Sequence, residues 1–392
     1  MELYLFNPEH DLALAHGEPH YLPPQIVRQF AQDYALLPFW YAKDNSTLLL
    51  FSEEQQKFLH HYNRLFNRSL TGLFHSQLKE FDGLSKVNPW GWNATLREQL
   101  IKAGITQQLL PSLAYIKKLT QLSHRSFSVN LLPQLQLSPY FCGESKLFQS
   151  VEELTEFVQS HKYSVLKEPL SGSGRGIMWC EQTLITSLQT WAKRVIDRQN
   201  GVIAEPMYAK TLDFAMEFEI DSNHQCHFVG YSMFYTSSLG SYQGNYLFND
   251  KKIEQRIAQY VPIAELEQLK EKLQYHLTHL AGPAYQGFLG VDMMICSFND
   301  SPLFRIHPCV EVNFRMNMGL VAHSIQTNFM DKNTEGKFTT YYYRKEGEAL
   351  TEHKAMHSKF PPIIKNNKLV SGYLPLVPVT STSRYRAWVI AE

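Results

Sequence analysis

The sequence lacks an excess of charge of either sign, since its 37 lysine and arginine residues are balanced by 37 aspartate and glutamate residues. A balanced chain has no strong field to draw it toward nucleic acid or anionic lipid. It also lacks long hydrophobic runs, because its wholly apolar segments, such as residues 48–51, are far too short to cross a membrane. We therefore expect small-molecule partners, and neither a nucleic-acid nor a membrane partner.

Cysteine is scarce, and the first residues lack the charged and then apolar pattern of a signal peptide. The cysteines are odd in number, widely spaced and without a CxxC pair, which argues against both a disulfide framework and a zinc site. These features favour a cytoplasmic enzyme, and a homo-oligomer is compatible with them. The residues expected to be reduced and packed in the interior are Cys142, Cys180, Cys226, Cys296 and Cys309.

The first residues, MELYLFNPEHDLALA, combine a short apolar strand, a polar turn at residues 7–11 and a helix-like run, which is an α/β opening. Further on, Asn93 can cap a helix over residues 94–103 that ends at Gly104. At 392 residues the chain has room for two or three domains. We place the end of the first domain near residue 115.

A glycine-rich stretch, SVLKEPLSGSGRGI, occupies residues 164–177. The β-branched and aromatic residues on both sides predict a strand, a glycine turn and a second strand. Walker and dinucleotide-binding loops are excluded, because both need another glycine spacing and a helix after the loop. The turn could hold phosphate with its backbone N–H groups, helped by Lys167 on the preceding strand. The alternative is a plain turn beside a solvated lysine.

A second constellation lies in residues 287–319, on two expected strands, FLGVDMMIC and PLFRIHPCVEVNFR, joined by a polar turn. Alternation along the second strand puts Glu311, Asn313 and Arg315 on one face, while Asp292 stands among apolar residues of the first. Carboxylate and amide oxygens suit Mg²⁺, whose coordination is completed by water and substrate phosphates. The alternative is a pair of strands with one solvated face.

With Lys167 and SGSGRG followed by VIAEPM, GVDMM and EVNFR, the chain resembles the ATP-grasp superfamily over about residues 116–320. The resemblance implies an α/β and α+β protein, in which an N-terminal α/β pre-ATP-grasp domain precedes two α+β subdomains that clasp ATP. The corresponding domains are residues 1–115, residues 116–204 with the glycine loop as a lid, and residues 205–392 with the metal site and a C-terminal extension.

The resemblance also implies roles for the matching residues. Lys167 would contact the α- and β-phosphates and Arg315 would steady the reacting group, so these two are the expected catalytic residues. Arg125 would take the place of an earlier phosphate-binding lysine. Nearby alternatives to Arg125 are Lys117, Lys118 and Lys146. The loop residues expected to cover the phosphates are Ser171, Gly172, Ser173, Gly174, Arg175 and Gly176.

For the base and the sugar, the resemblance assigns Glu205 to the adenine amino group and Asp213 to the ribose hydroxyls. The backbone near Pro206 and Met207 would lie beside the adenine. The implied Mg²⁺ ligands are Asp292, Glu311 and Asn313.

The activity implied by the resemblance is ligation, with ATP and Mg²⁺ as cofactors. A small-molecule carboxylate is activated as an acylphosphate, and an amine or another nucleophile then displaces phosphate. A small-molecule kinase that uses the same nucleotide site is an alternative, as is a nucleotide-binding protein without turnover. A biotin-dependent carboxylase is disfavoured, because the chain has no AMKM-like carrier motif.

Candidate substrate contacts lie in the turn after the first strand, where α/β domains bind ligands, and in one polar-aromatic loop. Capping of the turn and of the first helix is the alternative role for the turn residues. His276 and His279 have helical spacing without a nearby carboxylate, so they do not indicate a metal site. The C-terminal residues carry no signal of chemistry. The candidate substrate contacts are Asn7, His10, Asp11, Tyr242 and Asn245.

Overall fold

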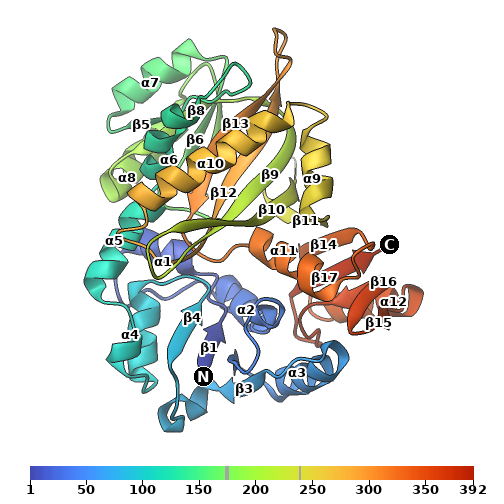
Figure 1. Cartoon of the computed structure of the whole chain (residues 1–392). Helices are drawn as coiled ribbons and strands as arrows, with labels where there is room; N and C mark the ends of the chain where they lie inside the picture. The colour runs from blue at the N-terminus through green and yellow to red at the C-terminus, as the bar shows by residue number, and fades with distance from the viewer. Residues whose placement is uncertain (173–175, 238–239) are drawn as a thin grey trace.

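The computed structural model describes residues 1–172, 176–237 and 240–392, and its N-terminal part is an α/β layer (Figure 1). A parallel four-stranded sheet has the order β3-β2-β1-β4. Its strands are β1 (Glu2–Leu5), β2 (Thr47–Leu50), β3 (Thr71–Phe74) and β4 (Lys86–Pro89). The helices of this part are α1 (His10–His16), α2 (Gln25–Asp33), η1 (Leu37–Trp40), α3 (Glu53–Phe66), η2 (His75–Glu80), α4 (Ala94–Lys102) and η3 (Gln107–Leu109).

The predicted helix after Asn93 is confirmed. The Asn93 side chain accepts a 2.9 Å hydrogen bond from the Leu96 N–H, which satisfies one of the free donors at the start of α4. Gly104 follows the helix with a φ of +95°, a conformation that glycine adopts without strain. The α/β opening inferred from the first residues is confirmed as well.

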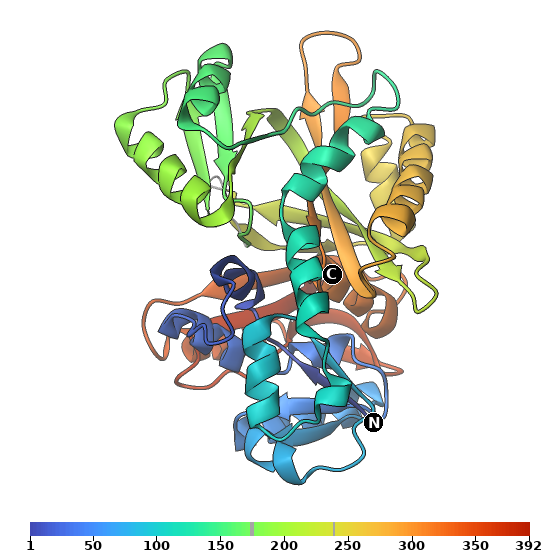
Figure 2. The same ribbon diagram turned by 90° about the vertical axis from the view of Figure 1, so that its left-hand side faces the viewer.

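The middle of the chain forms a smaller antiparallel sheet of order β5-β8-β6-β7. It contains β5 (Lys146–Phe148), β6 (Tyr163–Lys167), β7 (Ile177–Glu181) and β8 (Val202–Pro206), with the helices α7 (Val151–Ser160) and α8 (Thr186–Gln199). Lys167 pairs with Ile177, so the two strands predicted on either side of the glycine stretch are confirmed. Figure 2 shows the connection from the N-terminal part, which runs through α5 (Leu113–Ser123), α6 (Ser126–Leu131) and η4 (Leu132–Leu135).

The largest sheet has nine strands in the order β13-β12-β9-β10-β11-β14-β17-β16-β15. The strands are β9 (Ala209–Ile220), β10 (Cys226–Thr236), β11 (Tyr242–Leu247), β12 (Gly287–Ser297), β13 (Phe304–Asn313), β14 (Gly336–Tyr342), β15 (Ile363–Lys365), β16 (Lys368–Pro375) and β17 (Tyr385–Ala391). The accompanying helices are α9 (Asp250–Ile257), α10 (Ile263–Leu280), α11 (Met318–Phe329) and α12 (Glu348–Lys359). The predicted pair of strands at residues 287–319 is confirmed as β12 and β13.

Residues from both ends of the chain share one hydrophobic core. It contains Phe6 and Trp40 from the N-terminal part, and Val321, Leu374 and Val389 from α11, β16 and β17. The Trp40 indole also donates a 2.7 Å hydrogen bond to the carbonyl of Leu376. The C-terminal segment is therefore built into the N-terminal part of the fold, and this packing fixes the side of the molecule on which a site can form.

The described residues agree with the expectation for the cysteines and refine the one for the helices after residue 115. All five cysteines are free and buried. Within the described ranges, no helix is long and apolar enough to cross a membrane. The helical run expected from residue 115 to residue 132 is broken, because α5 ends at Ser123 and α6 starts at Ser126. This break points Arg125 toward the glycine loop.

Trp40→Ala should lower the free energy of unfolding by about 3–5 kcal/mol, because it removes a fully buried ring and leaves a cavity. Urea unfolding followed by far-ultraviolet circular dichroism measures the effect. Phe51→Ala is the control, since Phe51 is 45% exposed and should cost far less. Equal costs for the two variants would contradict the shared core.

Candidate active site

Two carboxylates face each other on β12 and β13, in the middle of the first strand and near the end of the second. Asp292 lies directly opposite Glu311 in the register, and the Asn313 amide donates a 3.0 Å hydrogen bond to Asp292. Burial, followed by the charges of Glu311 and Glu217, raises the pKa of Asp292 well above its ordinary range. Like charges at such close quarters disfavour the ionised state. A cation bound among these oxygens would remove that penalty.

Arg125 joins this carboxylate pair to the glycine loop. Its Nη2 donates to Glu311 Oε2 at 2.9 Å, and its Nη1 donates to the Ser171 hydroxyl and the Glu168 carbonyl, each at 2.5 Å. The alternative basic residues lie elsewhere, because the side chains of Lys117 and Lys118 are exposed on α5 and Lys146 pairs with Glu144. Of these four basic residues, Arg125 is therefore the one that reaches the loop.

Arg315 binds the turn after β1, which lies 304 positions earlier in the sequence. Its Nε and Nη2 donate to the two oxygens of Asp11, each at 2.9 Å. Burial by itself would raise the pKa of Asp11, but the neighbouring Arg315 holds it below its ordinary value. Gly172 packs on the same carboxylate, and a Cβ atom at this position would lie 1.9 Å from Asp11 Oδ2. Only glycine therefore lets the loop approach so closely.

Lys167 and Glu205 form a second, deeper pair on the neighbouring strands β6 and β8. The lysine Nζ lies 2.5 Å from Glu205 Oε2, and both side chains are only 7% exposed. Although burial opposes ionisation, Lys167 lowers the pKa of Glu205. Past the end of β8, the Met207 N–H donates to the Tyr163 carbonyl at 2.9 Å. Pro206 is the last residue of that strand.

The other predicted nucleotide residues occupy separate positions. Asp213 on β9 pairs with Lys210 at 2.5 Å and accepts a 3.3 Å hydrogen bond from Thr236. Gly176 lies directly before β7 and has a φ of +66°. Ser173, Gly174 and Arg175 lie outside the described residues, so their assignments stay predictions.

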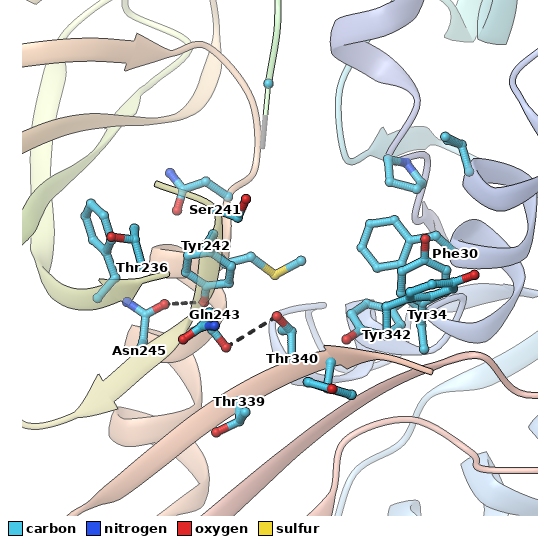
Figure 3. Close-up of a pocket in the computed structure, with 18 of the residues that line it drawn as sticks. Phe30, Tyr34, Thr236, Ser241, Tyr242, Gln243, Asn245, Thr339, Thr340 and Tyr342 are labelled. Carbon is cyan, nitrogen blue, oxygen red and sulfur yellow. Dashed lines mark hydrogen bonds between the residues drawn. The ribbon is translucent and has the colours of Figure 1, made fainter. Parts of the chain in front are cut away.

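A cavity of about 1800 Å³ opens beside the carboxylate pair. At one end it is lined by Arg125, Gly172, Asp292, Glu311 and Arg315. From there it extends between β10 and β11 on one side and α2 on the other, with β14 below (Figure 3). The predicted substrate contacts that line it are Asp11, Tyr242 and Asn245.

Asn7 and His10 lie behind the wall of this cavity rather than on it. The Asn7 amide donates to the Gly91 carbonyl at 2.8 Å and accepts from the Gly91 N–H at 3.3 Å. Burial lowers the pKa of His10 to about 4, so its imidazole is neutral at pH 7. A Cβ at Gly91 would lie 2.5 Å from that ring. Both side chains thus hold the turn against the loop around Gly91, and their role as substrate contacts stays a prediction.

Glu217 is a cavity residue that the sequence analysis missed. It is 1% exposed and accepts hydrogen bonds from Asn317 at 2.7 Å and Ser232 at 2.8 Å. Burial raises the pKa of Glu217 to about 7, although these two hydrogen bonds lower it. Gly290 and Gly319 make room for it, since a Cβ at either position would lie within 2.5 Å of a carboxylate oxygen. In the sequence, the sign that could have identified Glu217 is its position as a charged residue between the apolar Met216 and Phe218.

The C-terminal segment also supplies cavity residues, although its sequence showed no chemistry. The end of β14, the loop after it and the start of α12 reach the cavity, and β17 adds two side chains. The residues concerned are Thr339, Thr340, Tyr341, Tyr342, Tyr343, Arg344, Lys345, Glu346, Gly347, Glu348, Thr351, Glu352, Ala355, Tyr385 and Trp388. No local motif marks such residues, because long-range strand pairing brings them to the site.

His276 and His279 lie on α10, as their spacing predicted. Within residues 1–172, 176–237 and 240–392, no group of three or more His, Cys, Asp or Glu side chains is arranged as a ready metal site. The Asp292 and Glu311 pair, completed by the Asn313 amide, is thus the candidate for a cation that also uses water and substrate oxygens.

No protein-family model and no curated protein sequence matches the chain. Solved structures do match it in fold. A biotin carboxylase from Campylobacter jejuni, in a β-γ-ATP complex, has a TM-score of 0.52 at 11% identity, with 100% of this chain and 87% of that chain covered. N5-carboxyaminoimidazole synthetase from Staphylococcus aureus, with ADP, gives 0.50 at 10% identity over 90% and 94%.

A third match is the biotin carboxylase domain of the 2-oxoglutarate carboxylase from Hydrogenobacter thermophilus, solved with MgADP, ADP and bicarbonate. Its TM-score is 0.50 at 9% identity, and the match covers 90% of this chain and 87% of that domain. At such low identity the likeness establishes a shared fold over almost the whole chain.

Asp11→Asn should lower the free energy of unfolding by about 3 kcal/mol at pH 7, because the buried Arg315 loses its partner. Asp11 has a folded pKa below its ordinary 3.8, so its contribution is present above about pH 4 and is lost as the pH falls through the folded value. The difference from the wild type should therefore shrink toward pH 3. Urea unfolding across this range measures it, with the exposed Asp82→Asn as control. A difference that is independent of pH would contradict the ion pair.

The free energy of unfolding of the Glu217→Gln variant should increase relative to that of the wild type as the pH rises from 4.5 to 7. The comparison is made without added divalent metal. The unfolded chain releases this proton near pH 4.5, whereas the folded state holds it to about pH 7, so the wild type loses stability over this window. By about pH 8 the relative gain approaches about 3 kcal/mol. Urea unfolding of both proteins at several pH values gives the result, and a constant difference would argue against the buried, protonated carboxyl.

Proposed function

Since the chain has the ATP-grasp fold, we propose that it is an ATP- and Mg²⁺-dependent ligase that activates a small-molecule carboxylate as an acylphosphate and joins it to an amine or another nucleophile. One observation carries the proposal. Arg125, Arg315, the glycine loop and the Asp292 and Glu311 pair meet at one end of the large cavity. Cations and a metal-binding pair thus converge where a phosphoryl group would be transferred.

The nucleotide would bind between the small sheet and the strands β9, β12 and β13. We assign Lys167 and Arg125 to the phosphates, together with the backbone of the glycine loop. Glu205, Pro206 and Met207 form the proposed adenine edge, and Asp213 is the proposed ribose contact. The buried Lys167 and Glu205 pair supports this assignment, because it places a cation and a hydrogen-bond acceptor side by side on the neighbouring strands β6 and β8 of the small sheet.

Mg²⁺ fits the carboxylate pair, because Asp292 and Glu311 lie opposite each other beside the Asn313 amide, and Mg²⁺ prefers such oxygen ligands. Asp292, Glu311 and Asn313 would hold the ion, which supplies neutralisation of phosphate oxygens when bound. The chain's own part is to orient these oxygens. The Asn313 amide fixes Asp292, and Arg125 fixes Glu311.

The proposed reaction has two steps. An oxygen of the substrate carboxylate forms a bond to the γ-phosphorus, and the bond to the bridging oxygen breaks to release ADP. The amine nitrogen then bonds to the acyl carbon, phosphate leaves with the electron pair of the broken C–O bond, and the nitrogen loses a proton. Arg315 would stabilise the developing charge from its place beside the glycine loop, with Asp11 fixing the guanidinium. No nucleophilic side chain of the protein is needed.

Both substrates are proposed to be small molecules, and we propose neither nucleic-acid nor membrane partners because the chain has no net charge. The free, buried cysteines support a cytoplasmic location. A homo-oligomer is also proposed, since one of the structural neighbours is a domain dimer.

The proposal is tested by an ADP-release screen of carboxylates with hydroxylamine, which intercepts acylphosphates as hydroxamates. The expected result is ADP release that depends on one carboxylate and on Mg²⁺, with an equal amount of the hydroxamate. ADP release with a phosphorylated hydroxyl compound and no hydroxamate would instead indicate a kinase. Absence of nucleotide binding by calorimetry would overturn the whole assignment.

Asn313→Ala should lower the rate of ADP release by about 100-fold, because it removes a proposed metal ligand and the hydrogen bond that fixes Asp292. Asn299→Ala is the matched control, since Asn299 is exposed in the turn between β12 and β13. Both variants should unfold at the temperature of the wild type within a few degrees. Full activity in Asn313→Ala would remove Asn313 from the site.

A further inference from the structure

The cavity is much larger than the transfer of a phosphoryl group requires. Ligand pockets usually enclose about 300–1,000 Å³, whereas this one measures about 1800 Å³ without reaching Lys167 or Glu205. We call the part that lies between β10–β11, β14 and α2 the acceptor arm. Its walls contain Thr236, Ser241, Tyr242, Gln243, Asn245, Thr339, Thr340, Tyr342, Phe30 and Tyr34 (Figure 3).

Asn245 leaves a hydrogen-bond donor without a partner in this arm. The residue is 0% exposed, and its Oδ1 accepts a hydrogen bond from the Tyr242 hydroxyl. Its Nδ2 has no hydrogen-bond partner among the described residues. Leaving a buried donor unpaired costs free energy, so a ligand oxygen at this point is the natural complement. A carbonyl oxygen matches the donor without adding charge.

The strands β11 and β14 separate inside the acceptor arm. Their register ends at the pair of Gly244 and Thr339. Beyond it, the Tyr343 N–H donates to Arg384 beside β17, so by alternation along the strand the N–H and C=O of Tyr342 point the other way, toward the cavity. In the part of the chain that the structure describes, no strand pairs with this edge. It offers one donor and one acceptor to an extended chain.

An aromatic wall lies opposite Asn245, as Figure 3 shows for Phe30, Tyr34 and Tyr342. The ring of Phe30 lies 4.6 Å from that of Tyr34 and 4.7 Å from that of Tyr385, and Tyr342 is 4.8 Å from Tyr385. Rings fixed in this way give a broad apolar surface at low entropic cost. Such a surface suits an apolar side chain that projects from an extended backbone.

These features lead us to propose that the nucleophilic substrate is a short peptide, bound extended in the acceptor arm. The proposal rests on the ligase function above. A peptide carbonyl accepts from Asn245 Nδ2, a peptide amide pairs with the backbone of Tyr342, and a side chain packs on the rings of Phe30 and Tyr342. Its N-terminal amine then points to the end of the cavity that holds Arg315. A free amino acid has no peptide amide to pair with the backbone of Tyr342.

Equilibrium dialysis tests the proposal with a pool of random tripeptides, Mg²⁺ and a non-hydrolysable ATP analogue. Mass spectrometry of the retained fraction should show tripeptides enriched about tenfold over free amino acids of the same composition. A pool with N-methylated backbone amides should not be retained, because it has lost the donors that pair with Tyr342. Equal retention of the methylated pool, or no retained tripeptide, would overturn the proposal.

Asn245→Leu should lose about tenfold in tripeptide retention, since it keeps the side-chain volume and removes the amide donor. Asn130→Leu, on the exposed surface of α6, is the matched control and should retain tripeptides like the wild type. Calorimetry with the ATP analogue separates the two proposals. Normal nucleotide affinity without peptide retention refutes the peptide acceptor alone, whereas absent nucleotide affinity refutes the ligase.

Discussion

The bidentate ion pair between Asp11 and Arg315 is the contact on which the site depends. It joins the first turn of α1 in the N-terminal part to the second residue after β13, and the glycine loop packs on the same carboxylate. Two short polar contacts at 2.9 Å thus hold three parts of the chain in one place. A pair that is largely removed from water must be kept intact, because either partner alone would be a buried, uncompensated charge.

Around this pair the protein concentrates carboxylates that it does not neutralise. Asp292 and Glu217 have raised pKa values, and among the described residues their side-chain hydrogen-bond partners are amides and a hydroxyl. Such a cluster lowers stability unless a cation or a proton occupies it. Carboxylates with perturbed pKa values are concentrated at functional sites of proteins. The cluster therefore supports a ligand-binding role more strongly than any single residue does. The glycines at 290 and 319 confirm that the backbone is shaped around the Glu217 side chain.

The placement of the C-terminal strands explains why so large a cavity exists. The strands β14, β16 and β17 continue the sheet that begins with β13, and they also pack on the core around Trp40. The sheet therefore reaches from the strands β12 and β13 to the core of the N-terminal part, and the cavity lies where β11 and β14 separate. In physical terms, a core shared between both ends of the chain fixes the walls of the acceptor arm. No local feature of the segment itself could show this.

The sequence alone determined the local elements and the order of the motifs. Alternation predicted β12 and β13, the β-branched and aromatic residues around the glycine stretch predicted β6 and β7, and Asn93 predicted the start of α4, because each depends on neighbouring residues only. Tertiary structure decided the rest. It brought Arg125, and none of three nearby lysines, to the glycine loop, packed Asn7 and His10 against the loop around Gly91, and brought Glu217 and Tyr342 to the cavity. Such outcomes depend on contacts between residues far apart in the chain, and neither periodicity nor spacing carries information about those distances.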